Sequence, residues 1–301
     1  MVHFEKAVLF YNKIAGDSDV EQKLADTVPI LGRVIDELTL ISTETESDLQ
    51  TKCRNMAELV DLMIFLGGDG TVHTAINSIA PLQKRPVIAI LPGGTSNDFS
   101  RTLNIPQRLS EAAESLAQGK LIPIDVGKSN DDYFLNFWGI GLVSDTSKNV
   151  DGNQKESFGV LSYFMSTLKT IREADSFQYE IHADGGVKRE GEAVLVFVLN
   201  GCFVGTRRLP INSINPRDGI FDILIARNSN LASLRELMSL KNPDTDVTAL
   251  TELDYFQARE LKIITDSAKD IDMDGEINTR TPSVIQVLPN HLEFLVPFDF
   301  A

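Results

Sequence analysis

Two glycine-rich turns place the strongest constraint on the fold of this 301-residue chain. Residues 67–71 (GGDGT) follow an apolar run at 62–66, and residues 92–98 (PGGTSND) follow a second apolar run at 87–91. Each turn leads into a segment of helical character, so run, turn and helix together are typical of a βα unit. Successive βα units predict a parallel sheet covered by helices on both faces, with ligands beyond the carboxyl ends of the strands.

The first 126 residues continue this alternation and predict one α/β domain. Further strands are expected at 7–11 and 37–41, and further helices at 21–35, 48–60 and 110–118. Gly119 follows the last of these helices, in the position where a helix commonly ends.

Residues 127–290 predict a second, mainly antiparallel β domain, a sandwich or partial barrel. The strands expected after residue 126 are at 133–138, 177–181, 192–200, 220–226, 259–265, 284–288 and 291–296, with helices at 158–171 and 230–240. Turn signals at 184–186, 216–219 and 274–275 separate several of the strands. The apolar stripe of 158–171 is expected in the core, with a lipid-facing surface as the alternative. A cleft between the two domains is the expected place for a ligand.

Charge and hydropathy exclude several classes of function. The net charge of −15 argues against nucleic acid, which needs a basic face, and against strong electrostatic adhesion to an anionic bilayer. Arg207 and Arg208 with Arg217 are the best candidates for a local basic patch. The longest apolar runs have the length of strands, so no transmembrane segment is expected, and the first residues lack a signal-peptide pattern. The two cysteines, Cys53 and Cys202, predict reduced, buried thiols in a cytoplasmic protein.

The first glycine turn suits a phosphate group. Backbone N–H groups at a turn and helix start attract phosphate, and glycines let the ligand approach the backbone. Asp69 would repel phosphate unless a cation such as Mg²⁺ lay between them, so the turn predicts Mg²⁺ together with a nucleotide. Thr71 is expected to cap the following helix or to touch a phosphate. A plain βα turn is the alternative.

In the second turn, Thr95 is a candidate nucleotide contact, whereas Ser96, Asn97 and Asp98 also suit a helix N-cap.

Two later turns carry carboxylates that suit chemistry. Asp218, with neighbouring backbone carbonyls, would bind a hard cation, although residues 215–219 also fit an ordinary type I turn. Glu276 would serve as a general base for an acceptor hydroxyl, its proton affinity raised by the nearby Asp272 and Asp274. A solvated hairpin turn is the alternative for this second motif.

These four motifs, at 67–71, 91–99, 218–219 and 274–276, occur in the order found in one family. The chain resembles the bacterial diacylglycerol kinases, soluble lipid kinases that share a catalytic domain with sphingosine and ceramide kinases. The resemblance implies an NAD kinase/diacylglycerol kinase-like fold, in which a C-terminal segment (291–301) returns to the first domain. It also implies Mg²⁺-dependent transfer of the γ-phosphoryl group of ATP to a lipid hydroxyl, with diacylglycerol giving phosphatidic acid.

The resemblance also implies a role for particular residues. Glu276 would be the proton acceptor and Asp69 the ligand of the catalytic Mg²⁺, while Asn215, Asp218 and Ile220 would hold a second metal. Its implied ATP contacts are Asn12, Thr43, Gly67, Gly68, Asp69, Gly70, Thr71, Val72, His73, Gly94 and Thr95. The chain departs from the usual family pattern in its first turn, residues 12–16 (NKIAG), and at His73-Thr74, where the family has Asn-Glu.

The implied partner is a lipid substrate at a membrane surface, reached by transient peripheral contact from the cytoplasm, and a homodimer is one alternative for the oligomeric state. Two other functions stay open. NAD kinases and phosphofructokinases also use a Gly-Gly-Asp-Gly turn, so a kinase of a soluble acceptor is one of them. A non-catalytic lipid- or nucleotide-binding regulator is the other.

Overall fold

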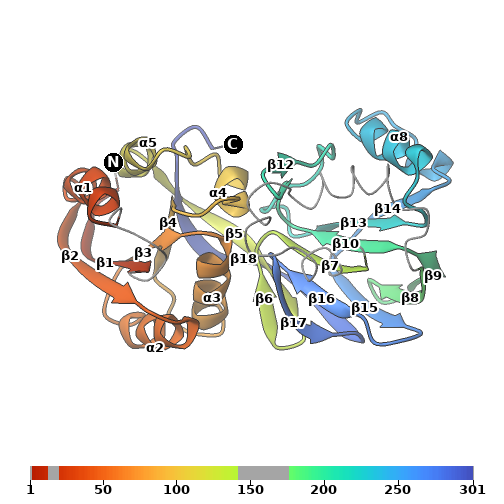
Figure 1. The fold of residues 1–301 in the computed structure, drawn as a ribbon, viewed down its shortest axis with the longest axis horizontal. Coiled ribbons are helices and arrows are strands. Elements are labelled where there is room, and N and C mark those ends of the chain that lie inside the picture. Colours follow the sequence, from red (N-terminus) through yellow and green to blue (C-terminus); the bar gives the residue numbers. More distant parts are fainter. Residues whose placement is uncertain (1, 13–19, 142–175, 301) are drawn as a thin grey trace. The chain divides into compact units, whose positions relative to one another are not determined.

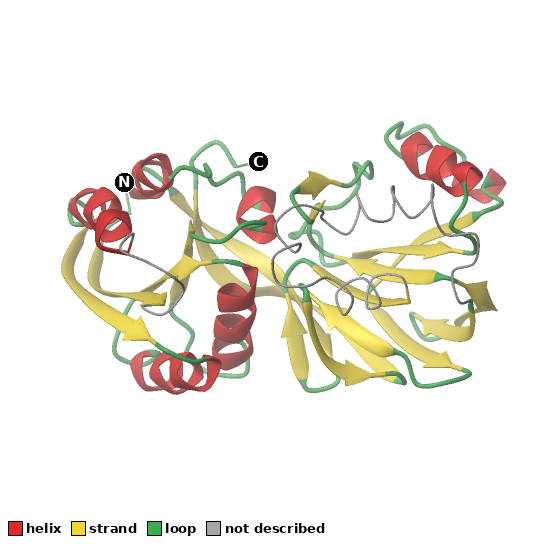
Figure 2. Cartoon of the chain, viewed as in Figure 1, coloured by secondary structure: helices red, strands yellow, loops and turns green. Residues whose placement is uncertain are grey.

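The computed structural model describes residues 2–12, 20–141 and 176–300. The chain forms two compact units, Met1–Ile124 with Asn290–Ala301, and Asp125–Pro289. The fold is mixed α/β, with a parallel sheet in the first unit and antiparallel sheets in the second, which confirms the predicted fold class. The predicted helix at 158–171 and residues 13–16 of the first turn lie outside the described residues. Figure 2 shows helices mainly in the first unit and strands mainly in the second.

The first unit is built on a parallel sheet with the order β2-β1-β3-β4. Its strands are β1 (Phe4–Asn12), β2 (Ile35–Thr43), β3 (Leu62–Gly67) and β4 (Val87–Pro92). β3 and β4 are buried almost throughout, as expected for parallel strands with helices on both faces. The last part of β18 (Ser283–Val296) lies parallel to β4, with Phe294 opposite Ile88.

Helices cover both faces of this sheet (Figure 1). α1 (Val20–Leu31) packs with α5 (Leu109–Ala117), and α2 (Glu46–Met56) packs with α3 (Asp69–Ile79). The predicted helix at 21–35 is too long, because the chain turns after Leu31 and enters β2 at Ile35. The helix predicted at 48–60 is also displaced, because α2 begins at Glu46 and ends at Met56.

Gly119 follows α5 as predicted, yet it lacks the left-handed backbone that usually requires glycine after a helix. A Cβ atom there would lie 2.3 Å from the carbonyl oxygen of Val296. The glycine therefore allows β18 to approach the end of α5 within the same unit.

The second unit contains two packed sheets. One has the order β14-β13-β10-β7-β16-β17, and the other joins part of β18 to β15, β8 and β9. Its strands are β5 (Lys120–Ser129, which begins in the first unit), β6 (Asp132–Phe134), β7 (Phe137–Gly141), β8 (Phe177–Ala183), β9 (Val187–Ala193), β10 (Leu195–Leu199), β11 (Phe203–Val204), β12 (Arg207–Arg208), β13 (Phe221–Ala226), β14 (Leu253–Ala258), β15 (Glu260–Thr265), β16 (Asp270–Met273) and β17 (Glu276–Arg280). The described part of this unit also contains the short helices α8 (Leu231–Ser239) and η1 (Val247–Ala249).

β10 shows where the core of this unit lies. Val196 and Val198 face the core between the two sheets, while Leu195, Phe197 and Leu199 pack in a second apolar cluster with α8. All five residues are buried, so the strand carries a continuous apolar run instead of an alternating pattern.

Some predicted strands differ from the structure. The strands predicted at 284–288 and 291–296 form one long strand, β18, and the strand predicted at 192–200 is divided between β9 and β10. The strand predicted at 133–138 breaks between β6 and β7. Both cysteines are buried, as predicted, and neither forms a disulfide; burial raises the pKa of the Cys53 thiol to about 12.

His291 on β18 predicts a pH dependence of stability. Burial lowers the pKa of His291, although the hydrogen bond between its Nε2 and the Ala80 carbonyl (2.8 Å) opposes this. The unfolded chain therefore takes up the proton first, and stability is lost as the pH is lowered through the ordinary value of 6.5. We expect His291→Gln to reduce the loss of stability between roughly pH 7.5 and pH 5.5 by a few tenths of a kcal/mol. Urea unfolding at both pH values measures this, with the exposed His3→Gln as control.

Candidate functional site

The two glycine turns lie against each other because β3 and β4 are neighbours, with Gly67 opposite Pro92. The Gly93 N–H donates a hydrogen bond to the Gly67 carbonyl at 2.9 Å. A Cβ atom on Gly94 would lie 2.5 Å from the Cα of Gly68, and one on Gly67 would lie 2.5 Å from Oγ1 of Thr71. Glycine therefore serves the packing of the two turns, which touch backbone to backbone, as well as access for a ligand.

This contact predicts a strong effect of Gly94→Ala. The added methyl group collides with backbone atoms, which cannot move as a flexible side chain can, so we expect a loss of about 1–3 kcal/mol in the free energy of unfolding. Thr95→Ala is the control, because Thr95 is exposed, and its expected change is within about 0.5 kcal/mol. Urea denaturation compares the two, and equal stability of both variants would contradict the close contact.

Asp69 is the first residue of α3, and its Oδ1 accepts a hydrogen bond from the Asp98 N–H at 2.7 Å. This carboxylate thereby caps α4 (Asp98–Thr102), whose own N-cap residue, Asn97, has a left-handed backbone and bonds back to Gly94 instead. The predicted cap by Thr71 is wrong, because the N-cap of α3 is Gly68 and Thr71 lies inside the first helical turn. Asp69 thus joins the two glycine turns.

The start of α3 has the electrostatics of an anion site that also holds a carboxylate. The first N–H groups of a helix, those of Asp69, Gly70 and Thr71 here, have no acceptor within the helix and favour negative charge. A phosphate bound there would meet the Asp69 carboxylate, and a divalent cation between them removes the repulsion. The donor set at this turn therefore fits a nucleotide with Mg²⁺.

Asn12 ends β1 at the same edge of the sheet. It lies opposite Thr43 on β2, and the β1–β3 register (Tyr11 opposite Leu66) brings it beside Gly67. The strand order changes direction between β1 and β3, and ligands of such sheets bind at this switch point. The structure thus brings Asn12 together with the glycine turns.

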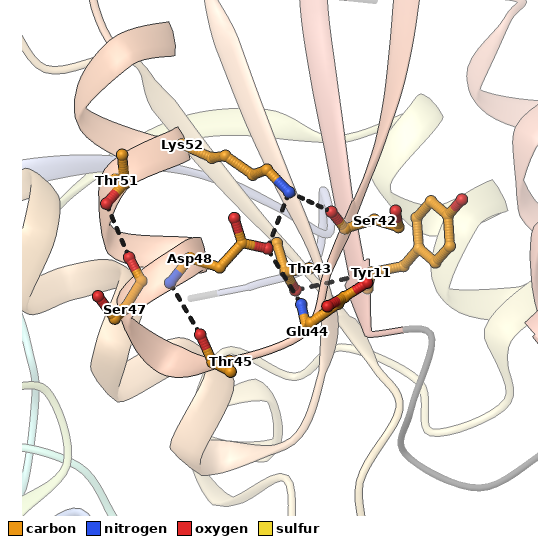
Figure 3. A network of polar contacts seen from close by, with 9 residues as sticks. All are labelled: Tyr11, Ser42, Thr43, Glu44, Thr45, Ser47, Asp48, Thr51 and Lys52. Atoms are coloured by element: carbon orange, nitrogen blue, oxygen red, sulfur yellow. Dashed lines mark hydrogen bonds and ion pairs between the residues drawn. The ribbon is translucent and has the colours of Figure 1, made fainter.

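Thr43 lies one strand farther out, in a network of internal contacts (Figure 3). Its buried hydroxyl donates to the Tyr11 carbonyl at 3.3 Å. Next to it, the Lys52 ammonium bonds the Ser42 carbonyl and the Asp48 carboxylate, both at 2.8 Å. This hydrogen bond from Lys52 lowers the pKa of Asp48. Thr43 therefore keeps only acceptor capacity for a ligand.

Val72 and His73 are buried in α3. The Val72 N–H already donates to the Gly68 carbonyl at 3.1 Å, and the Asn77 amide contacts both the ring and the carbonyl of His73. These two residues are less accessible to a nucleotide than Gly94 and Thr95, which are exposed.

The predicted metal residues lie in a turn of the second unit that β5 holds in place. The Gly219 N–H donates to the Asp125 carboxylate at 2.7 Å, and the Asp125 N–H donates to the Pro216 carbonyl at 2.8 Å. Asp218 accepts from the Ile220 N–H at 3.1 Å. Partial burial, together with the charges of Asp222 and Asp125, raises the pKa of the Asp218 carboxyl. A cation at this turn would relieve that repulsion, while Asn215 is exposed at its start.

Asp125 and Asp222 are buried carboxylates that the sequence analysis missed. Asp222 Oδ1 accepts hydrogen bonds from Ser213 and Tyr255, and burial raises the pKa of Asp222. Each of these aspartates is surrounded by apolar residues in a strand sequence, and an ionisable side chain in such a run is the signal that marks a buried charge.

Glu276 begins β17, directly after the predicted hairpin turn, where Asp274 and Gly275 both have positive φ. The Asp274 carboxylate accepts three backbone hydrogen bonds of 2.8–2.9 Å from residues 135–137, which turns the chain between β6 and β7. Asp272 accepts the Gly275 N–H at 2.8 Å. Both aspartates therefore shape the hairpin. The Glu276 carboxylate is partly exposed, and within the described part of the chain it accepts no hydrogen bond.

Within the described ranges, no three His, Cys, Asp or Glu side chains are arranged to hold a metal ion. The predicted set of Asn215, Asp218 and Ile220 is of another kind, because it relies on one carboxylate and backbone carbonyls, and it stays a prediction. None of the described helices is long and apolar enough to cross a membrane.

Comparison with known proteins identifies the family. The diacylglycerol kinase catalytic domain matches residues 6–129, and the YegS C-terminal NAD kinase beta sandwich-like domain matches residues 139–296. A Staphylococcus aureus (strain Newman) protein named "Putative lipid kinase" is 32% identical over 98% of both chains. The chain belongs to the bacterial diacylglycerol kinase family. This confirms the resemblance based on the four motifs and makes the protein a kinase-family member.

Solved structures of similar proteins agree with this diacylglycerol kinase family. A crystal structure of "a putative diacylglycerol kinase" from Bacillus anthracis str. Sterne is 36% identical and covers 100% of both chains with a TM-score of 0.88. A second structure, of a diacylglycerol kinase from the same organism, is 35% identical and covers 98% of both chains with a TM-score of 0.83.

Proposed function

We propose that this protein is an ATP- and Mg²⁺-dependent lipid kinase that phosphorylates a lipid hydroxyl, with diacylglycerol as the acceptor and phosphatidic acid as the product. The observation that carries the proposal is the pair of touching glycine turns, joined by Asp69 at the start of α3, in a member of a kinase family.

The first domain (residues 1–126 with 291–301) is the proposed ATP-binding domain. The first N–H groups of α3, with Gly94 and Thr95 of the second turn, would hold the phosphates, and Asn12 lies beside them at the end of β1. Phosphoryl transfer depends mainly on positioning and electrostatics, which a rigid pair of turns supplies.

Asp69 would hold the catalytic Mg²⁺, and Asn215, Asp218 and Ile220 would hold a second metal in the second unit. When bound, Mg²⁺ neutralises charge that develops on the phosphate oxygens. Asp69 presents a carboxylate at the proposed phosphate site, and Asp218 lies among carboxylates that repel one another. Both arrangements suit a hard cation with oxygen ligands.

Glu276 is the proposed proton acceptor in the second domain (residues 127–290). The acceptor hydroxyl oxygen attacks the γ-phosphorus of ATP, its proton moves to the Glu276 carboxylate, and the bond to ADP breaks. The carboxylate is partly exposed and makes no hydrogen bond within the described chain, so it is accessible for this transfer. General base catalysis of this kind contributes ~10²–10⁴ to a rate.

A screen of acceptors tests the proposal. The purified protein is incubated with γ-labelled ATP and Mg²⁺, and diacylglycerol, sphingosine and ceramide are supplied in mixed micelles. NAD and a sugar phosphate are supplied in solution. Label in phosphatidic acid is the expected result. Label in NAD or the sugar phosphate would favour a kinase of a soluble acceptor, and nucleotide binding without transfer to any acceptor would favour a regulator.

A further inference from the structure

A pocket of about 500 Å³ lies in the second unit, between the β11–β12 hairpin and α8. Figure 1 shows both elements along the same edge of that unit. Gly205 and Thr206 form the hairpin turn with positive φ, and the Leu209 N–H donates to the Cys202 carbonyl at 2.8 Å. The Asn212 amide donates to the Lys241 carbonyl at 2.6 Å. The first bond closes the hairpin, and the second links the segment after the hairpin to the chain just after α8.

Among the described residues that line the pocket, the charged side chains are all cations, namely Arg207, Arg208 and Lys241. Each is exposed, and within the described residues none of them forms an ion pair with a carboxylate. This concentration of positive charge occurs in a chain whose net charge is −15. An anionic partner would be repelled by most of the surface and attracted here.

Apolar side chains of α8 lie beside these cations, because Leu234, Leu237 and Met238 line the same pocket. Leu231, Leu234 and Met238 recur along one side of α8, with Leu231 58% and Met238 52% exposed. Leu237, three residues after Leu234, is buried in the apolar cluster that includes residues of β10 and β13. Leu237 and Leu240 anchor α8 in this cluster, whereas among the described residues Leu231 and Met238 stay more than half exposed.

We propose that this pocket docks the phosphate headgroup of an anionic phospholipid in a bilayer, with Leu231 and Met238 entering the acyl boundary. Cations beside exposed apolar side chains complement an anionic headgroup next to acyl chains. A free phosphate would use only the cations. The proposal rests on the lipid-kinase function and names the surface by which the protein reaches its acceptor.

Vesicle flotation without nucleotide or diacylglycerol tests the docking surface. The wild type is expected to bind phosphatidylcholine vesicles that contain phosphatidylglycerol and to bind pure phosphatidylcholine vesicles weakly. Each removed cation should weaken binding about fivefold, so Arg207→Ala/Arg208→Ala should lose about 25-fold. Leu231→Ser/Met238→Ser should also lose binding. Lys241→Ala removes one cation and should lose about fivefold. This single variant tests the proposal if the double variant unfolds.

Matched controls separate the surface from general effects. Arg259→Ala/Lys262→Ala removes two exposed cations of the same unit, and Val187→Ser removes an apolar side chain that is 49% exposed. Both should bind vesicles as the wild type does. Equal losses in these controls, or equal wild-type binding to both kinds of vesicle, would overturn the proposal. So would inorganic phosphate that binds the pocket as tightly as the vesicles do.

Transfer of label to a dispersed short-chain diacylglycerol, without vesicles, separates this proposal from the kinase function. The arginine variants should retain that activity while losing vesicle binding. A wild type that binds anionic vesicles through these residues but phosphorylates no lipid would support the docking surface and contradict the kinase function. If the wild type phosphorylates the dispersed lipid and the arginine variants bind vesicles normally, the result would support the kinase function and contradict the docking surface.

Discussion

Asp69→Asn is expected to lower the rate of phosphoryl transfer by about a thousandfold while the protein stays folded. The amide removes the negative charge that would hold Mg²⁺ against the phosphates. It keeps an oxygen that can accept the Asp98 N–H, which Asp69 accepts at 2.7 Å, so α4 retains its cap. Initial rates with labelled ATP over a series of Mg²⁺ concentrations, together with urea unfolding, measure both effects.

Asp69→Ala is the contrasting variant, because it removes the charge and the acceptor together. We expect it to lose the same activity and, in addition, about 0.5–2 kcal/mol of stability, the usual cost of a lost helix cap. If Asp69→Asn phosphorylated its acceptor at the wild-type rate, the Asp69 carboxylate would serve only to cap α4. The difference between the two variants therefore separates its chemical role from its structural one.

The parallel sheet of the first unit could be predicted because each of its signals is local. An apolar run, a glycine turn and a helical pattern lie next to one another in the chain, and neighbouring strands bring the turns together. The same locality identified the hairpin turn at Asp274 and Gly275, which needs two residues of positive φ. Local patterns thus located the glycine turn that contains Asp69 and the hairpin turn that precedes Glu276.

What the sequence did not reveal depends on contacts between distant residues. The break between β6 and β7 arises because the Asp274 carboxylate, far along the chain, binds three N–H groups of residues 135–137. Asp125 fixes the turn at Gly219 in the same way. β16 and β17 are short strands that gain their conformation from pairing with β7 and with each other. The sequence of each of these segments has no periodic pattern that would indicate its distant contacts.

Glu276→Gln is expected to lower kcat about 10²–10⁴-fold, with little change in the affinity for ATP. Glutamine has nearly the same shape but cannot take up the proton of the acceptor hydroxyl at neutral pH. No described group hydrogen-bonds the Glu276 carboxylate, so its replacement should leave the unfolding midpoint in urea unchanged. Labelled-ATP transfer to diacylglycerol in micelles and calorimetric titration with ATP and Mg²⁺ measure the two quantities.

Asp274→Ala distinguishes chemistry from structure at the same hairpin. Its carboxylate accepts three backbone N–H bonds, and removing a charged acceptor from them should cost about 2–3 kcal/mol of stability. If Glu276 takes up the proton, Glu276→Gln has a lower kcat and the stability of the wild type. In Asp274→Ala, by contrast, the main loss is in the free energy of unfolding. Should Glu276→Gln instead lose stability as Asp274→Ala does and keep its kcat when folded, Glu276 would belong to the turn, and the proton would have to leave by another group.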